Sequence, residues 1–185
     1  RRQRQMCIRD RIIADMEEAQ IVAVCDLYED RRNKIVEIVK KKSGVAPKSS
    51  ADYREFLQDG SVDAVIIATS WESHIRIAID CIRAGKVTAL EVGGAYSVED
   101  CKALVREYEQ FRTPFMFLEN CCYGKFELLS TALARKGMLG EIVHCHGAYG
   151  HDLRSEVLGG RINRHYRLKN YMERNCENYP THELG

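Results

Sequence analysis

Short, continuous apolar runs recur along the chain and are separated by longer amphipathic segments. The runs lie at residues 21–26 ("IVAVCD"), 62–69 ("VDAVIIAT"), 86–92 ("KVTALEV") and 114–120 ("PFMFLEN"). Apolar runs without polar alternation are typical of strands in a parallel sheet that is covered on both faces. The pattern therefore predicts four strands of such a sheet.

The segments between these runs have the spacing of amphipathic helices. One ends at Gly85, as helices commonly end at glycine, and the next opens with Ser97 and Asp100 in the spacing of a capping box. The residues expected on the buried faces are Ile35, Val36 and Val39, then Ile75, Ala78, Ile79 and Ile82, then Val98, Cys101, Val105 and Tyr108. Strands alternating with helices through short links predict a doubly wound α/β fold.

The pattern changes after Glu119. A helix is expected at about residues 124–136, followed by a strand at 141–149 ("EIVHCHGAY") and a long polar tail with little apolar periodicity. We interpret residues 12–118 as one domain. Residues 119–185 are interpreted as the beginning of a second α/β domain, whose remaining sheet is not in this chain.

A dinucleotide-binding version of this fold carries a glycine-rich phosphate loop about 20 residues before an acid at the end of a strand. Asp26 is such an acid, but residues 1–6 read "RRQRQM", and no G-x-G-x-x-G occurs in the sequence. Either the fold does not bind a dinucleotide, or the first strand and its loop have been lost. The spacing of the later strands favours the loss, with residues 1–11 as a foreign or misread head.

Composition narrows the classes of function. The 185 residues carry a formal net charge of +1, with 45% hydrophobic and 30% charged residues. A net charge this small does not produce the positive electrostatic potential that would attract nucleic acid or an acidic membrane. The longest apolar run is too short to span a bilayer. Eight cysteines occur without a C-x-x-C pair. We expect reduced cysteines in a reducing compartment such as the cytoplasm, with Cys25, Cys81, Cys101 and Cys145 packed as small hydrophobic residues.

Several residues of chemical interest follow the predicted strands at their carboxyl ends, where open α/β sheets bind ligands. They are Asp26, Thr69, Ser70, Trp71, His74, Glu91, Val92, Glu119 and Asn120. A carboxylate such as Asp26 binds the hydroxyls of an adenosine ribose and favours NAD over NADP; a turn or helix N-cap is the alternative. For His74, the alternatives are a ligand contact and an exposed or capping position.

Longer sequence patterns resemble those of a known protein family. "VAVCD", "DAVIIAT" with a following histidine, "AGK", "LEV" and "GKFELLSTALARKGMLGEIVHCHGAY" resemble the Gfo/Idh/MocA oxidoreductase family over residues 12–185. The resemblance implies an N-terminal Rossmann domain joined to a C-terminal α/β domain with a large open sheet. Most members carry Glu-Lys-Pro after the third strand, where the lysine assists proton transfer. Here Val92 stands in the lysine's place, and valine cannot move a proton.

Five further patterns, "WESH", "EV", "LENCCY", "GAYGHDLR" and "YPTH", resemble one branch that lacks this lysine. This branch is glycoside hydrolase family 109, the NAD-dependent α-N-acetylgalactosaminidases. The resemblance implies NAD contacts at Asp26, Trp71, His74, Glu91, Val92 and Asn120, with Thr69 and Ser70 beside them. It implies substrate binding and chemistry at Glu119, Tyr149, Arg167, Tyr179 and His182. Ser70 stands where proline is common and Glu183 where glycine is usual, so the substrate can differ.

The implied reaction is hydrolysis through transient oxidation at sugar C3, elimination of the C1 substituent and addition of water. We assign His182 to the 3-hydroxyl, because histidine titrates near neutrality, and Tyr149 or Tyr179 to C2. Glu119 and Arg167 would hold substrate or tune a tyrosine, whose pKa must fall from about 10 under a nearby cation or the oxidised nicotinamide. The implied partners are a sugar or glycoside and further copies of the full-length protein, with no nucleic acid and no membrane.

Three histidines, His144, His146 and His151, suggest a metal site. We set it aside, because no third ligand is evident beside His144 and His146 on one face of the expected strand, and the resemblance implies a sugar site without metal. Two alternative functions remain: an NAD-dependent sugar or polyol dehydrogenase of the same family, and a non-catalytic, sugar-responsive binding protein. The 185-residue chain itself is expected to bind NAD weakly or not at all and to be inactive, since it lacks the glycine loop.

Overall fold

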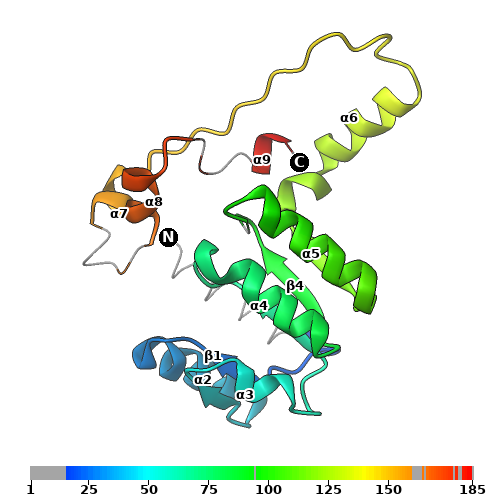
Figure 1. Cartoon of the computed structure of the whole chain (residues 1–185). Coiled ribbons are helices and arrows are strands. Elements are labelled where there is room, and N and C mark those ends of the chain that lie inside the picture. Colours follow the sequence, from blue (N-terminus) through cyan, green and yellow to red (C-terminus); the bar gives the residue numbers. More distant parts are fainter. Residues whose placement is uncertain are drawn as a thin grey trace. The chain divides into compact units, whose positions relative to one another are not determined.

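The structure, a computed structural model, describes residues 16–93, 95–159, 164, 166–176, 178 and 181–184 (Figure 1). These residues form two compact units. The first unit comprises the described residues up to Leu90 together with Ala95–Met116. The second comprises those from Glu91 to Gly93 and from Phe117 onward. The strand–helix alternation of the sequence falls mainly in the first unit, and the changed pattern falls in the second.

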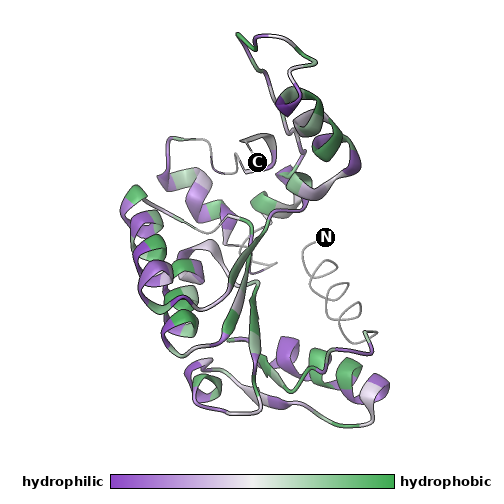
Figure 2. Ribbon diagram, turned by 90° about the vertical axis from the view of Figure 1, so that its right-hand side faces the viewer, coloured by the Kyte–Doolittle hydropathy of each residue, from purple (hydrophilic) through white to green (hydrophobic). Residues whose placement is uncertain are grey.

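The apolar runs form two short sheets. β1 (Ala23–Cys25) pairs in parallel with β2 (Lys48–Ser50). β3 (Ala64–Ile67) pairs in parallel with β4 (Val87–Glu91), and β5 (Phe115–Leu118) is the other neighbour of β4. All four predicted strands are confirmed, whereas the pattern missed β2, whose sequence "KSS" has no apolar run. In Figure 2 the strands are mainly apolar, whereas the helices carry both polar and apolar residues.

Burial of the strands is less complete than the apolar runs predict. Ile67 of β3 is 2% exposed and Leu90 of β4 is fully buried, but Ile66 of β3 is 47% exposed. Neighbouring residues of a strand point to opposite faces of the sheet. One face of β3 is therefore covered and the other is open, so the expectation that both faces are buried is wrong for this strand.

The first long helix follows the predicted periodicity. α2 (Glu29–Ser43) buries Ile35 and Val39, as expected, and ends at Gly44, whose φ of 77° is favourable for glycine. The short α3 (Arg54–Leu57) lies between β2 and β3. No helix among the described residues combines the length and the apolarity needed to cross a bilayer.

α4 (Trp71–Arg83) is the most deeply buried helix of the first unit. Its buried residues are Trp71, His74, Ile77, Ala78, Cys81 and Ile82. Ala78 and Ile82 are buried as predicted, whereas Ile75 and Ile79 are only partly buried, so the buried face is rotated from the expected one. The hydroxyl of Thr113 donates a hydrogen bond of 2.8 Å to the carbonyl of Ile82 and so connects this helix to the start of β5.

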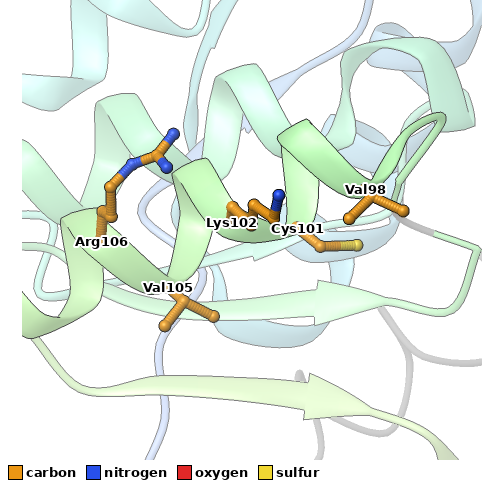
Figure 3. Close-up of a pocket in the computed structure, with 5 residues that line it drawn as sticks. All are labelled: Val98, Cys101, Lys102, Val105 and Arg106. Atoms are coloured by element: carbon orange, nitrogen blue, oxygen red, sulfur yellow. The ribbon is translucent and has the colours of Figure 1, made fainter.

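α5 (Val98–Phe111) begins at the predicted cap, where Ser97 Oγ accepts a hydrogen bond from the Asp100 N–H. The prediction of its buried face is wrong. The residues expected inside are all exposed: Val98, Cys101, Val105 and Tyr108. Three of them line a shallow apolar groove with the basic residues of the same helix (Figure 3). α5 packs against α4 instead, through a contact that includes a guanidinium–carboxylate pair between Arg83 and Glu107.

The described cysteines are all free, as predicted. Their expected packing is confirmed only for Cys81, which is buried; Cys25 is half-buried, and Cys101 and Cys145 are exposed. Burial raises the pKa of Cys81 to about 12 and that of Cys25 to about 11. The two thiols are therefore poor nucleophiles, because the thiolate is the reactive form.

The second unit is mainly helical. It contains the 3₁₀ helix η1 (Asn120–Tyr123) and the α-helices α6 (Lys125–Arg135), α7 (Arg154–Leu158), α8 (Arg167–Glu173) and α9 (Thr181–Leu184). α6 confirms the predicted helix. The strand predicted at 141–149 is wrong, since these residues form no strand and Val143 is 89% exposed. A strand needs a partner for its backbone N–H and C=O groups, and no described segment pairs with this one.

Candidate active site in the second unit

Glu119 and His182 form the centre of the second unit's polar site. Glu119 directly follows β5 and caps η1, so that its Oε1 accepts a hydrogen bond of 2.9 Å from the Cys121 N–H. His182 lies on α9, which packs beside η1 near the start of α6 (Figure 1). Its Nδ1 is 2.6 Å from the same Glu119 Oε1, and the two side chains are 8% and 4% exposed, respectively. The structure thus brings together two predicted site residues that are 63 positions apart.

Tyr149 completes the cluster. Its ring packs edge-on against His182, with centroids 4.4 Å apart and planes at 64°. On another side it contacts His151, with centroids 4.5 Å apart. Aromatic pairs prefer such tilted or edge-to-face arrangements. Tyr149 therefore lies beside the predicted histidine although the strand expected to carry it does not form.

The electrostatic surroundings of Tyr149 differ from the expectation. Burial is the largest cause that raises its pKa above the usual value, and Cys121 and Glu119 add to the increase. Arg167 on α8 lowers the pKa of Tyr149, in the expected direction, but the raising effects are stronger. Arg167 alone therefore does not supply the lowering that the mechanism requires, and the effect of an oxidised nicotinamide stays a prediction. Tyr149 is held as a neutral phenol, a proton donor.

Cys121 is the residue of this cluster that sequence reasoning missed. Burial raises the pKa of its thiol, and the Glu119 carboxylate raises it further. The signal was present in "LENCCY", because residue 121 is two positions after the acid, within the same helical turn. Glu119, Cys121 and His182 each offer a donor atom, and these atoms lie within 4.8 Å of one another. Among the described residues, His144, His146 and His151 belong to no such group.

The other predicted residues of the second unit lie at chain turns. The Val92 N–H donates a hydrogen bond of 3.1 Å to Glu91 Oε1, and Val92 is 1% exposed. Asn120 is exposed on η1, next to Glu119. Tyr179 lies outside the described residues. Its assignment remains a prediction from the sequence.

The predicted cofactor residues of the first unit follow β1 and β3. Asp26 Oδ1 accepts a hydrogen bond of 2.9 Å from the Tyr28 N–H, so the carboxylate forms the turn that precedes α2. This turn is the alternative considered for Asp26, and a carboxylate can make it with one oxygen while the other binds a ligand. Asp26 therefore retains the chemistry that a ribose requires.

The residues after β3 are more constrained than their pattern suggested. His74 is fully buried, and its Nε2 is 3.0 Å from the Thr69 carbonyl. Trp71 is 2% exposed, and Thr69 Oγ1 is 2.7 Å from Ser73 Oγ. Ser70 is the N-cap residue of α4. His74 therefore holds the loop through its contact with the Thr69 carbonyl, and Thr69 itself is exposed.

The residues present fit part of a dinucleotide site. In the first unit, Asp26 suits an adenosine ribose. In the second unit, the turn at Glu91 and Val92 offers backbone groups beside a half-buried carboxylate. No G-x-G-x-x-G phosphate loop occurs in the sequence. These donors are part of the set that a Rossmann-type dinucleotide-binding protein uses.

Comparison with known families assigns the class more closely. Residues 8–116 match the model of the "Oxidoreductase family, NAD-binding Rossmann fold", and the chain belongs to this family. Residues 123–185 match the model of the "Glycosyl hydrolase 109, C-terminal domain". The chain is 35% identical over 178 residues to glycosyl hydrolase family 109 protein 1 of Akkermansia muciniphila. This match covers 94% of this chain and 37% of the relative. It is 36% identical over 178 residues to an α-N-acetylgalactosaminidase of Bacteroides fragilis, and this match covers 92% of this chain and 42% of the relative.

Solved structures confirm the fold. A scyllo-inositol dehydrogenase from Lactobacillus casei, with bound NAD(H) and scyllo-inositol, matches with a TM-score of 0.64 and 20% identity, over 75% of this chain and 40% of that chain. An oxidoreductase from Agrobacterium radiobacter, in complex with NAD+, L-tartaric acid and magnesium, matches with a TM-score of 0.59 and 26% identity, over 74% and 39%. The chain spans about two fifths of the length of these proteins and of the curated relatives.

Proposed function

We propose that the chain carries the cofactor-binding half and the first active-site residues of an NAD-dependent glycoside hydrolase acting on α-N-acetylgalactosaminide-like substrates. The observation that carries this proposal is the hydrogen bond between Glu119 and His182, with the Tyr149 ring packed against the histidine. A base held by a buried carboxylate beside a phenol is a proton-transfer arrangement. The similarity to relatives named α-N-acetylgalactosaminidase supports the same substrate class.

NAD would be held by Asp26 at its adenosine ribose and by the residues after β3, β4 and β5, and it would supply a reversible acceptor for hydride from the sugar. The chain's own residues then manage protons. The Glu119 carboxylate can only accept a hydrogen bond, so we assign a proton to Nδ1 of His182. The basic nitrogen of His182 is then Nε2, the atom that would take the proton of the sugar 3-hydroxyl. Glu119 fixes the ring and stabilises the imidazolium that forms.

Tyr149 would act next to this base. Because its pKa is raised, the phenol donates a proton or a hydrogen bond rather than starting as a base. Arg167 acts on Tyr149 electrostatically and would favour the phenolate after the proton leaves. Tyr179 remains the second candidate at C2. In the elimination, the Tyr149 phenolate or Tyr179 would take the proton from C2 as the C1 substituent leaves, and the same group would return it when water adds to C1.

The domain organisation follows the same proposal. Residues 12–118 would form the NAD-binding domain, and residues 119–185 the beginning of the substrate domain. A cytoplasmic location and a homo-oligomeric whole protein belong to this proposal too. An NAD-dependent sugar or polyol dehydrogenase is the second candidate, favoured by the dehydrogenases among the similar structures. Val92 weighs against it, since it occupies the position of the lysine in most such enzymes.

A chimera tests the proposal directly. Residues 12–185 of this chain replace the matching segment of the Akkermansia muciniphila relative, which restores the parts that the chain does not span. We expect release of the aryl group from an aryl α-N-acetylgalactosaminide, dependent on NAD⁺, without net formation of NADH. Stoichiometric NADH from a free sugar, without aryl release, supports the dehydrogenase. Ligand-dependent thermal stabilisation with neither signal supports a binding protein.

A further inference from the structure

We propose that Glu119, Cys121 and His182 bind a zinc-type divalent cation in this chain. The three side chains contribute a carboxylate oxygen, a thiol sulfur and an imidazole nitrogen, and their donor atoms lie within 4.8 Å of one another. Two of them come from the turn that follows β5, and the third comes from α9. The cation would therefore connect segments that are far apart in the sequence.

The chemistry of the donors selects the ion. Zn²⁺ binds cysteine sulfur, histidine nitrogen and carboxylate oxygen, and three protein ligands leave its fourth position to water. Mg²⁺ and Ca²⁺ prefer sets of oxygen ligands and are disfavoured by a thiolate. Cys121 is only partly buried, so an ion has access to the site from its side. The cluster thus fits Zn²⁺, or Co²⁺ as its spectroscopic substitute.

An unpartnered buried atom points to the same ligand. Glu119 is 3% exposed, and its Oε2 is buried without a hydrogen-bond partner in the described part of the chain. Its other oxygen, Oε1, accepts from the Cys121 N–H and contacts His182 Nδ1. A buried carboxylate oxygen without a partner costs free energy, which a bound cation would recover. The backbone hydrogen bond also fixes the orientation of the carboxylate.

Metal binding requires a small rearrangement of the present contacts. Tetrahedral Zn²⁺ with bonds of about 2.0–2.3 Å separates its ligand atoms by about 3.5 Å. Nδ1 and Oε1 are now 2.6 Å apart, so the ring and the carboxylate must separate by about 1 Å. The Cys121 thiol loses its proton to solvent as the sulfur–metal bond forms, and the His182 proton moves from Nδ1 to Nε2 so that Nδ1 can bind the ion.

The cation and the Glu119–His182 hydrogen bond therefore exclude each other. If His182 is the base of the proposed reaction, a bound cation removes it from proton transfer and inhibits the enzyme. This consequence rests on the proposed function, whereas binding of the cation does not. A failure of one is thus distinguishable from a failure of the other.

Titration of the reduced 185-residue chain with Co²⁺ tests the binding. We expect one tightly bound ion, a thiolate-to-cobalt charge-transfer band and loss of this band when Zn²⁺ is added. Cys121→Ser should abolish the band and weaken binding at least about tenfold. Two matched controls, Cys122→Ser and Cys145→Ser, should retain both; the second tests the thiol between His144 and His146. Serine keeps the backbone N–H that bonds to Glu119, and far-UV circular dichroism checks the fold of each variant.

Three results would overturn the site: no thiolate band in the unsubstituted chain, a band unchanged by Cys121→Ser, or a band lost only with Cys145→Ser. In the chimera, inhibition by Zn²⁺ that Cys121→Ser relieves would connect the site to the proposed reaction. An inactive chimera whose cobalt band still depends on Cys121 would contradict the proposed function and leave the metal site standing.

Discussion

Glu119 and His182 share a hydrogen bond of 2.6 Å with both side chains nearly excluded from solvent. A buried imidazole held this way has one tautomer and one orientation. Glu119 is therefore expected to act through His182, as a positioning residue. Replacing it tests whether the proposed base needs its carboxylate partner.

In the chimera, Glu119→Gln should lower kcat by about 10²-fold or more, with a smaller change in KM. The amide keeps the size of the side chain but cannot stabilise the imidazolium by its charge. Steady-state kinetics on the aryl glycoside measure the effect, and Glu119→Asp, which keeps the charge, should recover part of it. An unchanged kcat for Glu119→Gln would show that the proposed base does not depend on the Glu119 carboxylate.

Tyr149→Phe separates the ring of this residue from its hydroxyl. The ring contact with His182, at 4.4 Å between centroids, should remain, so the thermal stability of the chimera should hardly change. The proton donor is lost, and kcat should fall by about 10²–10⁴-fold. Differential scanning fluorimetry and kinetics on one preparation test both parts. Full activity of Tyr149→Phe would transfer the role at C2 to Tyr179.

The fold could be predicted from the sequence where a pattern describes the element itself. The apolar runs at β1, β3, β4 and β5 and the periodicity of α2 and α6 are local properties, and the structure confirms them. Which face of a helix is covered depends on distant segments. The sequence therefore predicted the apolar face of α5 correctly, but the prediction that this face is buried is wrong, since its hydrophobic residues line an open groove.

Some residues of the candidate site could be predicted from the sequence, and others could not, because their contacts depend on the tertiary fold. Glu119, Tyr149 and His182 were found from the resemblance to a family, and the structure brings them together. Cys121 was missed because its position two residues after Glu119 indicates one neighbour only, whereas the approach of His182 depends on the tertiary fold. For the pKa of Tyr149, burial outweighs the effect of the cation Arg167, and the lowering by an oxidised nicotinamide stays a prediction.

Alkaline pH should destabilise the first unit through Tyr53. This phenol donates a hydrogen bond of 2.6 Å to Asp80 Oδ2, and burial together with that bond raises its pKa to about 12. The unfolded phenol titrates near 10. Between these values the folded chain binds the extra proton, so the stabilisation is complete below about pH 10 and is lost as the pH rises toward 12.

Urea unfolding midpoints of the 185-residue chain between pH 9 and pH 12 measure this effect. The midpoint should fall less steeply with pH in Tyr53→Phe than in the unsubstituted chain. A residual slope is expected, because the raised pKa values of Cys25 and Cys81 act in the same direction. Identical slopes in the two proteins would show that the hydrogen bond to Asp80 does not persist in solution.

Two isoleucines of the first unit differ in burial and provide a matched pair for the packing. Ile82 on α4 is fully buried, whereas Ile66 on β3 is 47% exposed. Ile82→Ala should lower the free energy of unfolding by about 2–5 kcal/mol, because the mutation leaves a cavity as well as losing apolar burial. Ile66→Ala removes the same atoms from a half-exposed site and should cost less than about half as much. Urea unfolding of both variants at neutral pH gives the comparison. Equal losses would mean that Ile66 is covered in solution by a part of the protein outside the described residues, or by another copy of the chain.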